Sequence, residues 1–407
     1  MTPLRCFNLI SRFQPHTIAA HFPRALSSTA STSRGKTRVY TPGGYHPLKI
    51  SDRLHGRYRI VHKLGYGASS TTWLARDEKS SKYLYVAIKR KSWPGGLDPT
   101  GARSFWDRGP NGTHSCLVTA PERCSLADVG EASWSALFQL DVARSLAAQL
   151  AAAVAYVHDQ GYAHGDLHLG NLLLRLPSEL DHLSIDQLYD EFGPPEAEPI
   201  VRQDGTPLPP GVPSHAISPV EFGKPSEQIE LSEAKLLLTD FGVAFCPSRE
   251  ARYESHTPLK IRPPEARFEP TKPVSFASDI WSLGCSIWAI LGQRPVFDPS
   301  ASMPFGRLPP EWWDKWAARS RQFTETGQPV DGRSPRSWDE RFQDSMHQSR
   351  CRENMATVDE KERDALSMMI RWMLAFRSGD RPSAKQVLET VWMRDWALPA
   401  YEKTTRE

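Results

Sequence analysis

The segment 164–171, which reads HGDLHLGN, constrains this chain more than any other, together with the triplet Asp240-Phe241-Gly242. An Asp followed five positions later by an Asn, after a helical and an apolar run, is the layout of a loop that carries out phosphoryl transfer. Asp166 would orient an acceptor hydroxyl and take its proton, while Asn171 and Asp240 would hold the Mg²⁺ ions that bridge nucleotide phosphates. The alternative is a surface loop in which Asp and Asn cap turns.

Length and composition indicate a chain with a substantial core. It has 407 residues, 39% of them hydrophobic, and a formal net charge of +3, which predicts two or three compact units and gives no support for a nucleic-acid partner. No apolar run is long enough to span a membrane, and the alanine-rich stretch 146–157 predicts a buried helix. The six cysteines form no C-x-x-C pair. We therefore expect reduced thiols, as in a protein of the cytoplasm or nucleus, and no disulfide framework or zinc site.

The first 51 residues contain no Asp or Glu and carry seven Lys and Arg, with a serine-rich stretch at 27–33. An Arg- and Ser-rich, acid-free start is typical of a mitochondrial transit peptide. The alternative is a disordered basic tail without a targeting role.

A strand followed by a glycine-rich turn is predicted from Tyr58. Residues 58–64 alternate as a strand does, and residues 65–75 then read GYGASSTTWLA. The glycines allow a tight turn whose backbone N–H groups can close over phosphates. A strand at 85–89 ends in Lys89, which would contact the α- and β-phosphates. A Gly-x-Gly pair alone is also typical of a hairpin, so it is the order of glycines, strand and lysine that favours a nucleotide site.

Six residues have the spacing that is typical of the eukaryotic protein kinases: Gly65, Gly67, Lys89, Asp166, Asn171 and Asp240. The chain resembles that family. Three segments resemble the fungal branch of the SR-protein kinases, which phosphorylate serines in Arg-Ser-rich proteins. They are residues 64–74, the sequence GPNGTHSCLV at 109–118 and the catalytic loop. The resemblance covers roughly residues 45–396.

The resemblance implies an α+β protein kinase fold of two lobes. We expect a basic arm, a small β-rich lobe and a large helical lobe with two loop inserts: residues 1–39, 40–121 and 122–400, with inserts at about 176–230 and 301–360. It also implies ATP and Mg²⁺ as cofactors, an Arg-Ser-rich protein as the substrate, and a monomer without membrane or direct nucleic-acid contact.

The same resemblance assigns the site residues. The nucleotide would be bound by Leu64, Gly65, Tyr66, Gly67, Ala68, Ser69, Ser70, Thr72, Ala87 and Lys89. The catalytic residues would be Asp166 and His168, and the metal ligands Asn171 and Asp240.

The largest departure from the family follows Lys89, where a helix normally supplies a glutamate that pairs with the lysine. No glutamate occurs between Lys89 and Cys116, and the segment 91–101 holds two prolines and three glycines, which disfavour a helix. We expect this helix and one strand to be absent, so that Lys89 loses its partner and the small-lobe sheet exposes an apolar face. Three interpretations follow: a mispredicted or alternatively spliced product, which we favour, a degenerate pseudokinase, or an active kinase with an unusual lobe.

Two further departures lie in the catalytic loop. Gly165 replaces an arginine that in many kinases grips a phosphate on the activation segment, which predicts activity independent of phosphorylation there. His168 stands where a lysine normally neutralises charge on the transferred phosphoryl group, and a partly charged histidine predicts a lower rate. The loop also resembles that of aminoglycoside and choline kinases, which would imply a small hydroxylated acceptor. The triplet at 240–242, the PPE at 263–265 and SDIWSLG at 278–284 argue against that class.

Helices are predicted in the large lobe at 140–160, 276–291, 365–376 and 383–391. In the family, the glutamate that closes the activation segment pairs with a late arginine, which implies a pair between Glu265 and Arg381. Asp279 would accept hydrogen bonds from the catalytic-loop backbone, or would simply cap its helix.

Two long loops remain. The insert at 176–230 is rich in Pro and Gly, and we expect a surface excursion without a catalytic role, with a short helix near 185–189. In the tryptophan-rich region 304–348, SR-protein kinases have an acidic groove for arginine-rich substrates, but here packing under a long loop is the favoured role of the aromatic residues.

Overall fold

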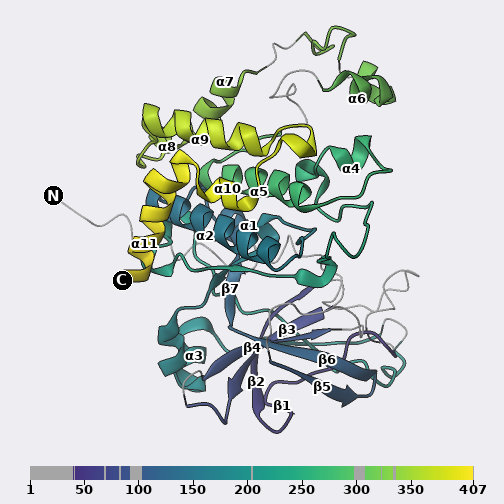
Figure 1. Ribbon diagram of the computed structural model, residues 1–407. Helices are drawn as coiled ribbons and strands as arrows, with labels where there is room; N and C mark the ends of the chain where they lie inside the picture. The colour runs from purple at the N-terminus through teal and green to yellow at the C-terminus, as the bar shows by residue number, and fades with distance from the viewer. Residues whose placement is uncertain are drawn as a thin grey trace, which may run out of the picture. The chain divides into compact units, whose positions relative to one another are not determined.

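The computed structural model describes residues 40, 42–67, 70–81, 84–91, 103–202, 205–297, 308–321, 323–332 and 336–406. The arm at 1–39 and the segment 92–102 therefore lie outside the described residues. The chain forms two compact units (Figure 1). Unit 1 holds the described residues up to Pro121 together with Pro177–Phe222, and unit 2 holds Glu122–Leu176 and Gly223–Glu407.

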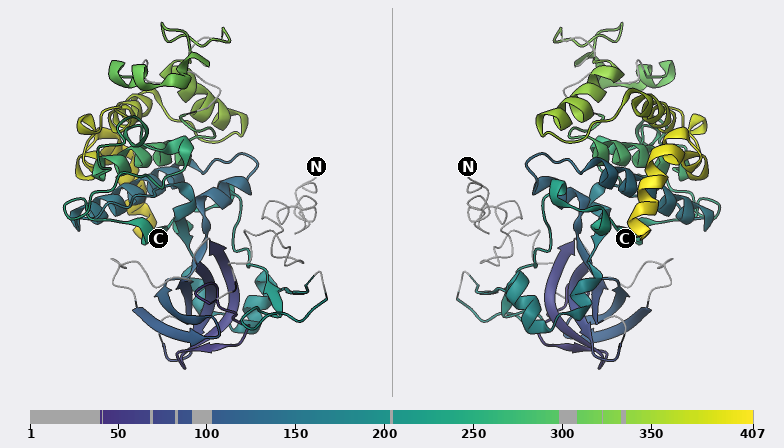
Figure 2. Two further views of the ribbon diagram at one scale, coloured as in Figure 1. Left: turned by 90° about the vertical axis from the view of Figure 1, so that its right-hand side faces the viewer. Right: turned by 90° about the vertical axis from the view of Figure 1, so that its left-hand side faces the viewer.

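A six-stranded antiparallel sheet forms the framework of unit 1, in the order β1-β2-β3-β4-β6-β5 (Figures 1 and 2). Its strands are β1 (Arg53–Leu54), β2 (Tyr58–Gly67), β3 (Ser70–Asp77), β4 (Tyr85–Lys91), β5 (Arg103–Gly109) and β6 (Gly112–Thr119). The prediction that a strand is absent after Lys89 is wrong, because β5 and β6 are both present. β5 is an edge strand whose side chains are all exposed or only half-buried, so it carries no apolar run that would mark it in the sequence. The predicted absence of a helix concerns residues 92–102, which are not described.

The sheet of unit 1 is covered, contrary to the expected exposed apolar face. One face bears fully or nearly buried apolar side chains: Tyr58, Ile60, Trp73, Ile88 and Cys116. Leu48 and Leu54, which precede β2, pack on this face together with Ile217. These apolar residues, some of which precede the strand predicted from Tyr58, remove from water the surface that we expected to be exposed.

The insert is the second difference from expectation, because it was predicted as a surface excursion of the large lobe, whereas Pro177–Phe222 packs with unit 1. Asp181 accepts hydrogen bonds from the N–H groups of Leu84 and Tyr85, at 3.0 and 2.9 Å. The predicted short helix is confirmed as α3 (Ile185–Phe192), where Ser184 and Gln187 form a capping box.

Further contacts join the insert to β2. The hydroxyl of Tyr189 donates to the carbonyl oxygen of Val61 at 2.9 Å. The N–H of Val220 donates to the carbonyl oxygen of Lys63 at 2.8 Å. Strands β9 (Ala197–Pro199) and β10 (His215–Ile217) form a small ribbon within the insert.

Unit 2 is mainly helical. Its helices are α1 (Leu126–Glu131), α2 (Leu140–Asp159), α4 (Glu265–Phe268), α5 (Phe276–Leu291), α6 (Pro310–Lys315), α7 (Trp338–Phe342), α8 (Gln348–Arg352), α9 (Glu360–Met373), α10 (Ala384–Leu388) and α11 (Leu398–Arg406). A three-stranded sheet accompanies them, in the order β11-β8-β7: Leu236–Leu238, Leu172–Arg175 and Glu122–Ser125.

Helices α2 and α5 supply much of the core of unit 2. By length and composition, α2 is the one described helix that could cross a membrane, yet most of it is buried in this core. The prediction of a buried alanine-rich helix is therefore confirmed.

The tryptophans after α5 are packing residues, as predicted. Trp312 and Trp313 are each 1% exposed and form a cluster with Leu308 and Phe323. The ring of Trp338 meets that of Trp288 edge to face, with centroids 4.8 Å apart.

Candidate functional site

The catalytic-loop segment begins at the end of α2 and is fixed by its backbone. Gly161 turns the chain with φ +82°, and Ala163 then pairs with Phe245 through two backbone hydrogen bonds of 2.8 and 3.0 Å. Asp279, near the start of α5, accepts hydrogen bonds from the N–H groups of His164 and Gly165 at 2.6 and 2.9 Å. Ser275, not Asp279, caps α5. Asp279 therefore holds the loop, as the family resemblance implied.

Asp279 is buried, and its neighbours act against the effect of burial on its carboxylate. Burial alone would raise its pKa, but the hydrogen bond from His158 Nε2 at 3.0 Å, the electrostatic effect of His158 and His164 and the N–H of Gly165 lower the pKa below its ordinary value. Sequence reasoning missed His158, because a histidine in the last turn of a helix has no motif that distinguishes it from a solvated residue.

Asp166 is held close to Asn171 and His168. The amide nitrogen of Asn171 donates to the carbonyl oxygen of Asp166 at 2.8 Å and lies 3.4 Å from its carboxylate Oδ2. The other carboxylate oxygen, Oδ1, is buried and lies 3.7 Å from His168 Nε2, and it has no hydrogen-bond partner among the described residues. His168 Nδ1 accepts a hydrogen bond from Gly170 N–H at 3.1 Å, so its Nε2 is the nitrogen that can carry a proton.

Strand pairing brings the two predicted metal ligands to the same end of a ribbon. Leu172 of β8 is opposite Leu238 of β11 in an antiparallel pair. Asn171 precedes the first strand and Asp240 follows the second, so both lie at that end. The N–H of Thr239 donates to the carbonyl oxygen of Asn171 at 3.0 Å, which fixes the register. Asp240 is exposed and adopts the left-handed backbone conformation, with φ +61°.

These two residues suit a hard cation in their chemistry. Because the amide nitrogen of Asn171 is used by Asp166, its side-chain oxygen is the atom left to face a ligand. A carboxylate and an amide oxygen are ligands that Mg²⁺ accepts, with phosphate oxygens and waters completing its coordination. Within the described part of the chain, no group of three or more His, Cys, Asp or Glu could hold a metal by itself.

The predicted nucleotide residues lie in unit 1. The glycine-rich turn joins β2 and β3, whose register is Gly65 opposite Thr72, Tyr66 opposite Thr71 and Gly67 opposite Ser70. Ala68 and Ser69 fall outside the described residues, and Leu64 is half-buried.

Strand β4 carries the other two nucleotide residues. Lys89 pairs with Thr72 of β3 and Leu117 of β6. Ala87, two positions earlier on the same face of the strand, is completely buried.

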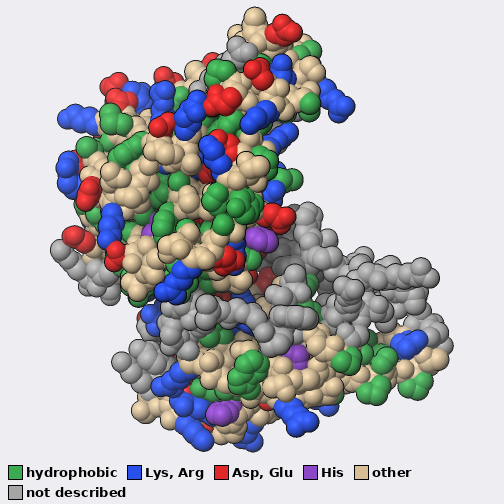
Figure 3. Space-filling model, turned by 45° about the vertical axis from the view of Figure 1, so that its right-hand side comes forward, with side chains coloured by type: hydrophobic (Ala, Val, Ile, Leu, Met, Phe, Trp, Pro, Cys, Tyr) green, Lys and Arg blue, Asp and Glu red, His purple; other side chains and the backbone are tan. Residues whose placement is uncertain are grey.

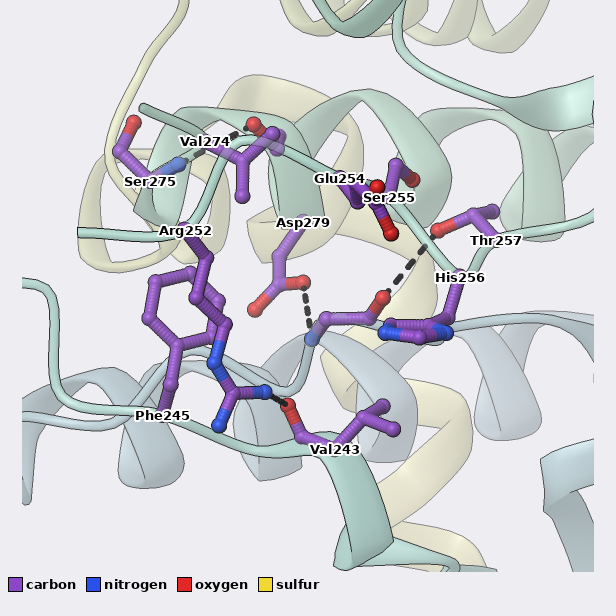
Figure 4. Close-up of a pocket in the computed structure, with 12 residues that line it drawn as sticks. Val243, Phe245, Arg252, Glu254, Ser255, His256, Thr257, Val274, Ser275 and Asp279 are labelled. Carbon is purple, nitrogen blue, oxygen red and sulfur yellow. Dashed lines mark hydrogen bonds between the residues drawn. The ribbon is translucent and has the colours of Figure 1, made fainter. Parts of the chain in front are cut away.

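The activation segment, residues 240–265, closes on a buried ion pair. Glu265 opens α4, and Arg381 reaches it from the loop before α10. The predicted pairing is confirmed, and both terminal nitrogens of the guanidinium, Nη1 and Nη2, donate to the carboxylate. A small cavity of about 10 Å³ lies beside the segment, lined among others by Gly165, Phe245 and Arg252 (Figure 4).

Comparisons with known proteins agree with this geometry. The chain is 24% identical to a serine/threonine protein kinase of Aspergillus fumigatus, over 97% of this chain and 99% of the relative. It is 23% identical to the serine/threonine-protein kinase SRPK of Physarum polycephalum, over 88% of this chain and 91% of the relative. No protein-family model matches the chain.

Among solved structures, a crystal structure of a kinase domain matches with a TM-score of 0.53 and 15% identity, over 86% of this chain and 98% of that one. This likeness shows the fold, a small β-rich unit followed by a large helical one. Over most of its length the chain is therefore similar to serine/threonine protein kinases, among them an SR-protein kinase.

Proposed function

We propose that this kinase transfers the γ-phosphoryl group of ATP to serine or threonine hydroxyls of Arg-Ser-rich proteins. The observation that carries the proposal is the Asp166 carboxylate, with one buried oxygen that lacks a partner beside Asn171 and His168. An oxygen in this state can accept the proton of an acceptor hydroxyl.

The proposal assigns a role to each site residue. Asp166 orients the acceptor hydroxyl and receives its proton at Oδ1, while His168 donates toward the same carboxylate or to the transferred phosphoryl group. Asn171 and Asp240 would hold Mg²⁺, which when bound bridges the nucleotide phosphates and offsets their charge. The nucleotide would be held by Lys89 together with the turn and strands around it: Leu64, Gly65, Tyr66, Gly67, Ala68, Ser69, Ser70, Thr72 and Ala87.

The Arg-Ser preference is drawn from the relatives and not from an acidic surface on this chain. The face of unit 2 seen in Figure 3 mixes basic and acidic side chains. The open groove of about 590 Å³ next to α6 is lined by Arg267, Lys272 and Lys315, with Glu269 as its one acidic residue. An arginine-rich segment would find little attraction there.

A catalytically impaired pseudokinase is the second candidate. It is favoured by the sequence after Lys89, which contains no glutamate before Cys116 to serve as the usual partner of the lysine. A small-molecule kinase of the aminoglycoside or choline type is the third candidate, and it is supported only by the sequence of the catalytic loop.

The test is transfer of labelled phosphate from ATP and Mg²⁺ to an Arg-Ser repeat peptide by the purified full chain. Asp166→Ala is the inactive variant, and Asp159→Ala, which removes an exposed carboxylate at the end of α2, is its matched control. Transfer by the parent and the control but not by Asp166→Ala supports the proposal. Transfer by none of them, from protein shown to be folded, favours the pseudokinase. Transfer to choline or an aminoglycoside, without transfer to peptide, favours the third candidate.

A further inference from the structure

Position 165 in the catalytic loop has no room for a long side chain. Gly165 has φ +78°, and a Cβ placed there would lie 3.2 Å from the carbonyl oxygen of Val243 and 3.6 Å from the ring of Phe245. The loop therefore offers no place for an arginine that could grip a phosphorylated residue of the activation segment.

A different arginine, Arg252 on the activation segment itself, lines the same small cavity (Figure 4). Its Nη1 donates to the carbonyl oxygen of Val243 at 2.5 Å, and its guanidinium carbon lies 5.0 Å from the centre of the Phe245 ring. Its Nε and Nη2 donate to the carboxylate of Glu250, at 2.7 and 3.3 Å. Its backbone oxygen accepts from the N–H of Val274 at 2.7 Å. Arg252 thus connects the start of the activation segment, its middle and the chain beyond Glu265, where the segment ends.

Phe245 connects Arg252 to the catalytic loop. Its ring is 3% exposed and packs with Ala163 and Val274. Its backbone pairs with Ala163, the residue immediately before the loop. The cavity that remains beside these residues, about 10 Å³, holds one water at most, so the packing leaves little freedom for the segment to shift.

The substrate-facing end of the segment is fixed to the same loop. Thr257, which is 3% exposed, lies with its hydroxyl 3.5 Å from the carbonyl oxygen of Gly165. Arg262 in turn donates from Nε to the carbonyl oxygen of Thr257 at 3.0 Å. A displacement of the segment near Arg252 would therefore be transmitted to the residues that receive a peptide.

We infer that Arg252 is a positioning residue that holds the activation segment in its peptide-receiving conformation without any phosphorylated residue. The inference rests on the proposed function, since it presupposes a peptide acceptor. A guanidinium can stack on Phe245 and donate a fork of hydrogen bonds at the same time, whereas an ammonium group cannot do both. Lysine at position 252 would keep the positive charge but could not both stack on Phe245 and donate the fork of hydrogen bonds.

The test compares Arg252→Ala and Arg252→Lys with Arg249→Ala, which removes an exposed arginine of the same segment. KM for the Arg-Ser peptide and for ATP are measured separately, on protein treated with phosphatase. We expect Arg252→Ala to raise the peptide KM by about tenfold or more while the ATP KM and Tm stay unchanged. Arg252→Lys should recover only part of that loss, and Arg249→Ala should behave as the parent. A parent-like peptide KM in Arg252→Ala, or loss of parent activity after phosphatase treatment, would reject the inference.

Limited proteolysis gives a readout that does not depend on transfer. If the parent transfers no phosphate, the proposed function fails, but cleavage within residues 246–262 still reports how the segment is held. Faster cleavage there in Arg252→Ala than in the parent and in Arg249→Ala supports the role of Arg252. Equal cleavage in all three proteins rejects it.

Discussion

Arg381 donates two hydrogen bonds to the carboxylate of Glu265, at 2.8 and 2.7 Å, and both side chains are buried. The same guanidinium also donates to three backbone carbonyls: those of Ala375, Phe376 and Ala277. Together these bonds attach the end of the activation segment to two separate parts of unit 2, the start of α5 and the loop after α9. Removing one partner would leave a buried charge without compensation.

We therefore predict that Glu265→Ala lowers the free energy of unfolding by roughly 3–5 kcal/mol. Lys272→Ala is the control, because it breaks a pair with Glu269 in which the lysine side chain is 69% exposed. Such a surface pair is worth about 0–1 kcal/mol. Urea unfolding of the three proteins measures the difference, and equal losses in the two variants would contradict the buried-pair account.

Asp240→Asn should strongly lower the rate of Mg²⁺-dependent transfer while the fold remains. Asparagine tolerates the left-handed backbone at φ +61° and keeps the shape of the side chain, so only the charge is removed. We expect a loss of about 10²–10³-fold in kcat, with an unchanged Tm. Transfer assays over a Mg²⁺ series check this. Transfer close to that of the parent would exclude Asp240 as a metal ligand.

Asp181→Ala should weaken unit 1 through two backbone groups. The N–H groups of Leu84 and Tyr85 both donate to Asp181 Oδ1 and would lose this acceptor. The expected cost is about 1–3 kcal/mol, together with weaker nucleotide binding, because Tyr85 begins the strand that carries Lys89. Asp190→Ala, which removes an exposed carboxylate of α3, is the control. Nucleotide titration and thermal unfolding would show both effects, and identical behaviour of the two variants would argue against them.

Lys63 gives a prediction about pH. It is 7% exposed, and burial lowers the pKa of its ammonium to about 8 from 10.5. Between these two values the unfolded chain holds a proton that the folded chain has lost, so the free energy of unfolding rises as the pH increases from about 8 to 10.5. Below pH 8 both states are protonated, and the buried charge destabilises the fold.

Lys63→Met should therefore be more stable than the parent at pH 7, and the difference should shrink between pH 8 and 10. The rings of Tyr66 and Trp73 lie 4.9 and 5.9 Å from the ammonium and offset part of its burial, so we expect a gain of about 1–2 kcal/mol at pH 7. Lys49→Met, at an exposed position, should follow the parent at every pH. A constant difference between Lys63→Met and the parent from pH 7 to 10 would show that burial does not govern this lysine.

Local patterns predicted the elements that have clear boundaries. Helix α5 begins at Phe276 and ends at Leu291 as expected, because Ser275 caps one end and Gly292 follows the other. Helix α9 begins at Glu360, before the predicted 365, because Asp359 caps a polar first turn that shows no apolar period.

Long-range packing could not be predicted in the same way. Asp181 is 97 residues from its partner Leu84, and no local pattern indicates which distant N–H group a carboxylate will reach. Arg252 was missed because its function depends on the space beside Gly165, and a single arginine in a polar segment carries no motif.

The insert also determines when the protein can finish folding. On the ribosome, β4 emerges well before Asp181, so its first N–H groups have no acceptor until the catalytic loop has been made. The β8–β11 pair must in turn close a loop that contains the whole insert. The amino-terminal unit is therefore completed late in synthesis, and a fragment ending at Pro121 would leave the N–H groups of Leu84 and Tyr85 without their carboxylate acceptor.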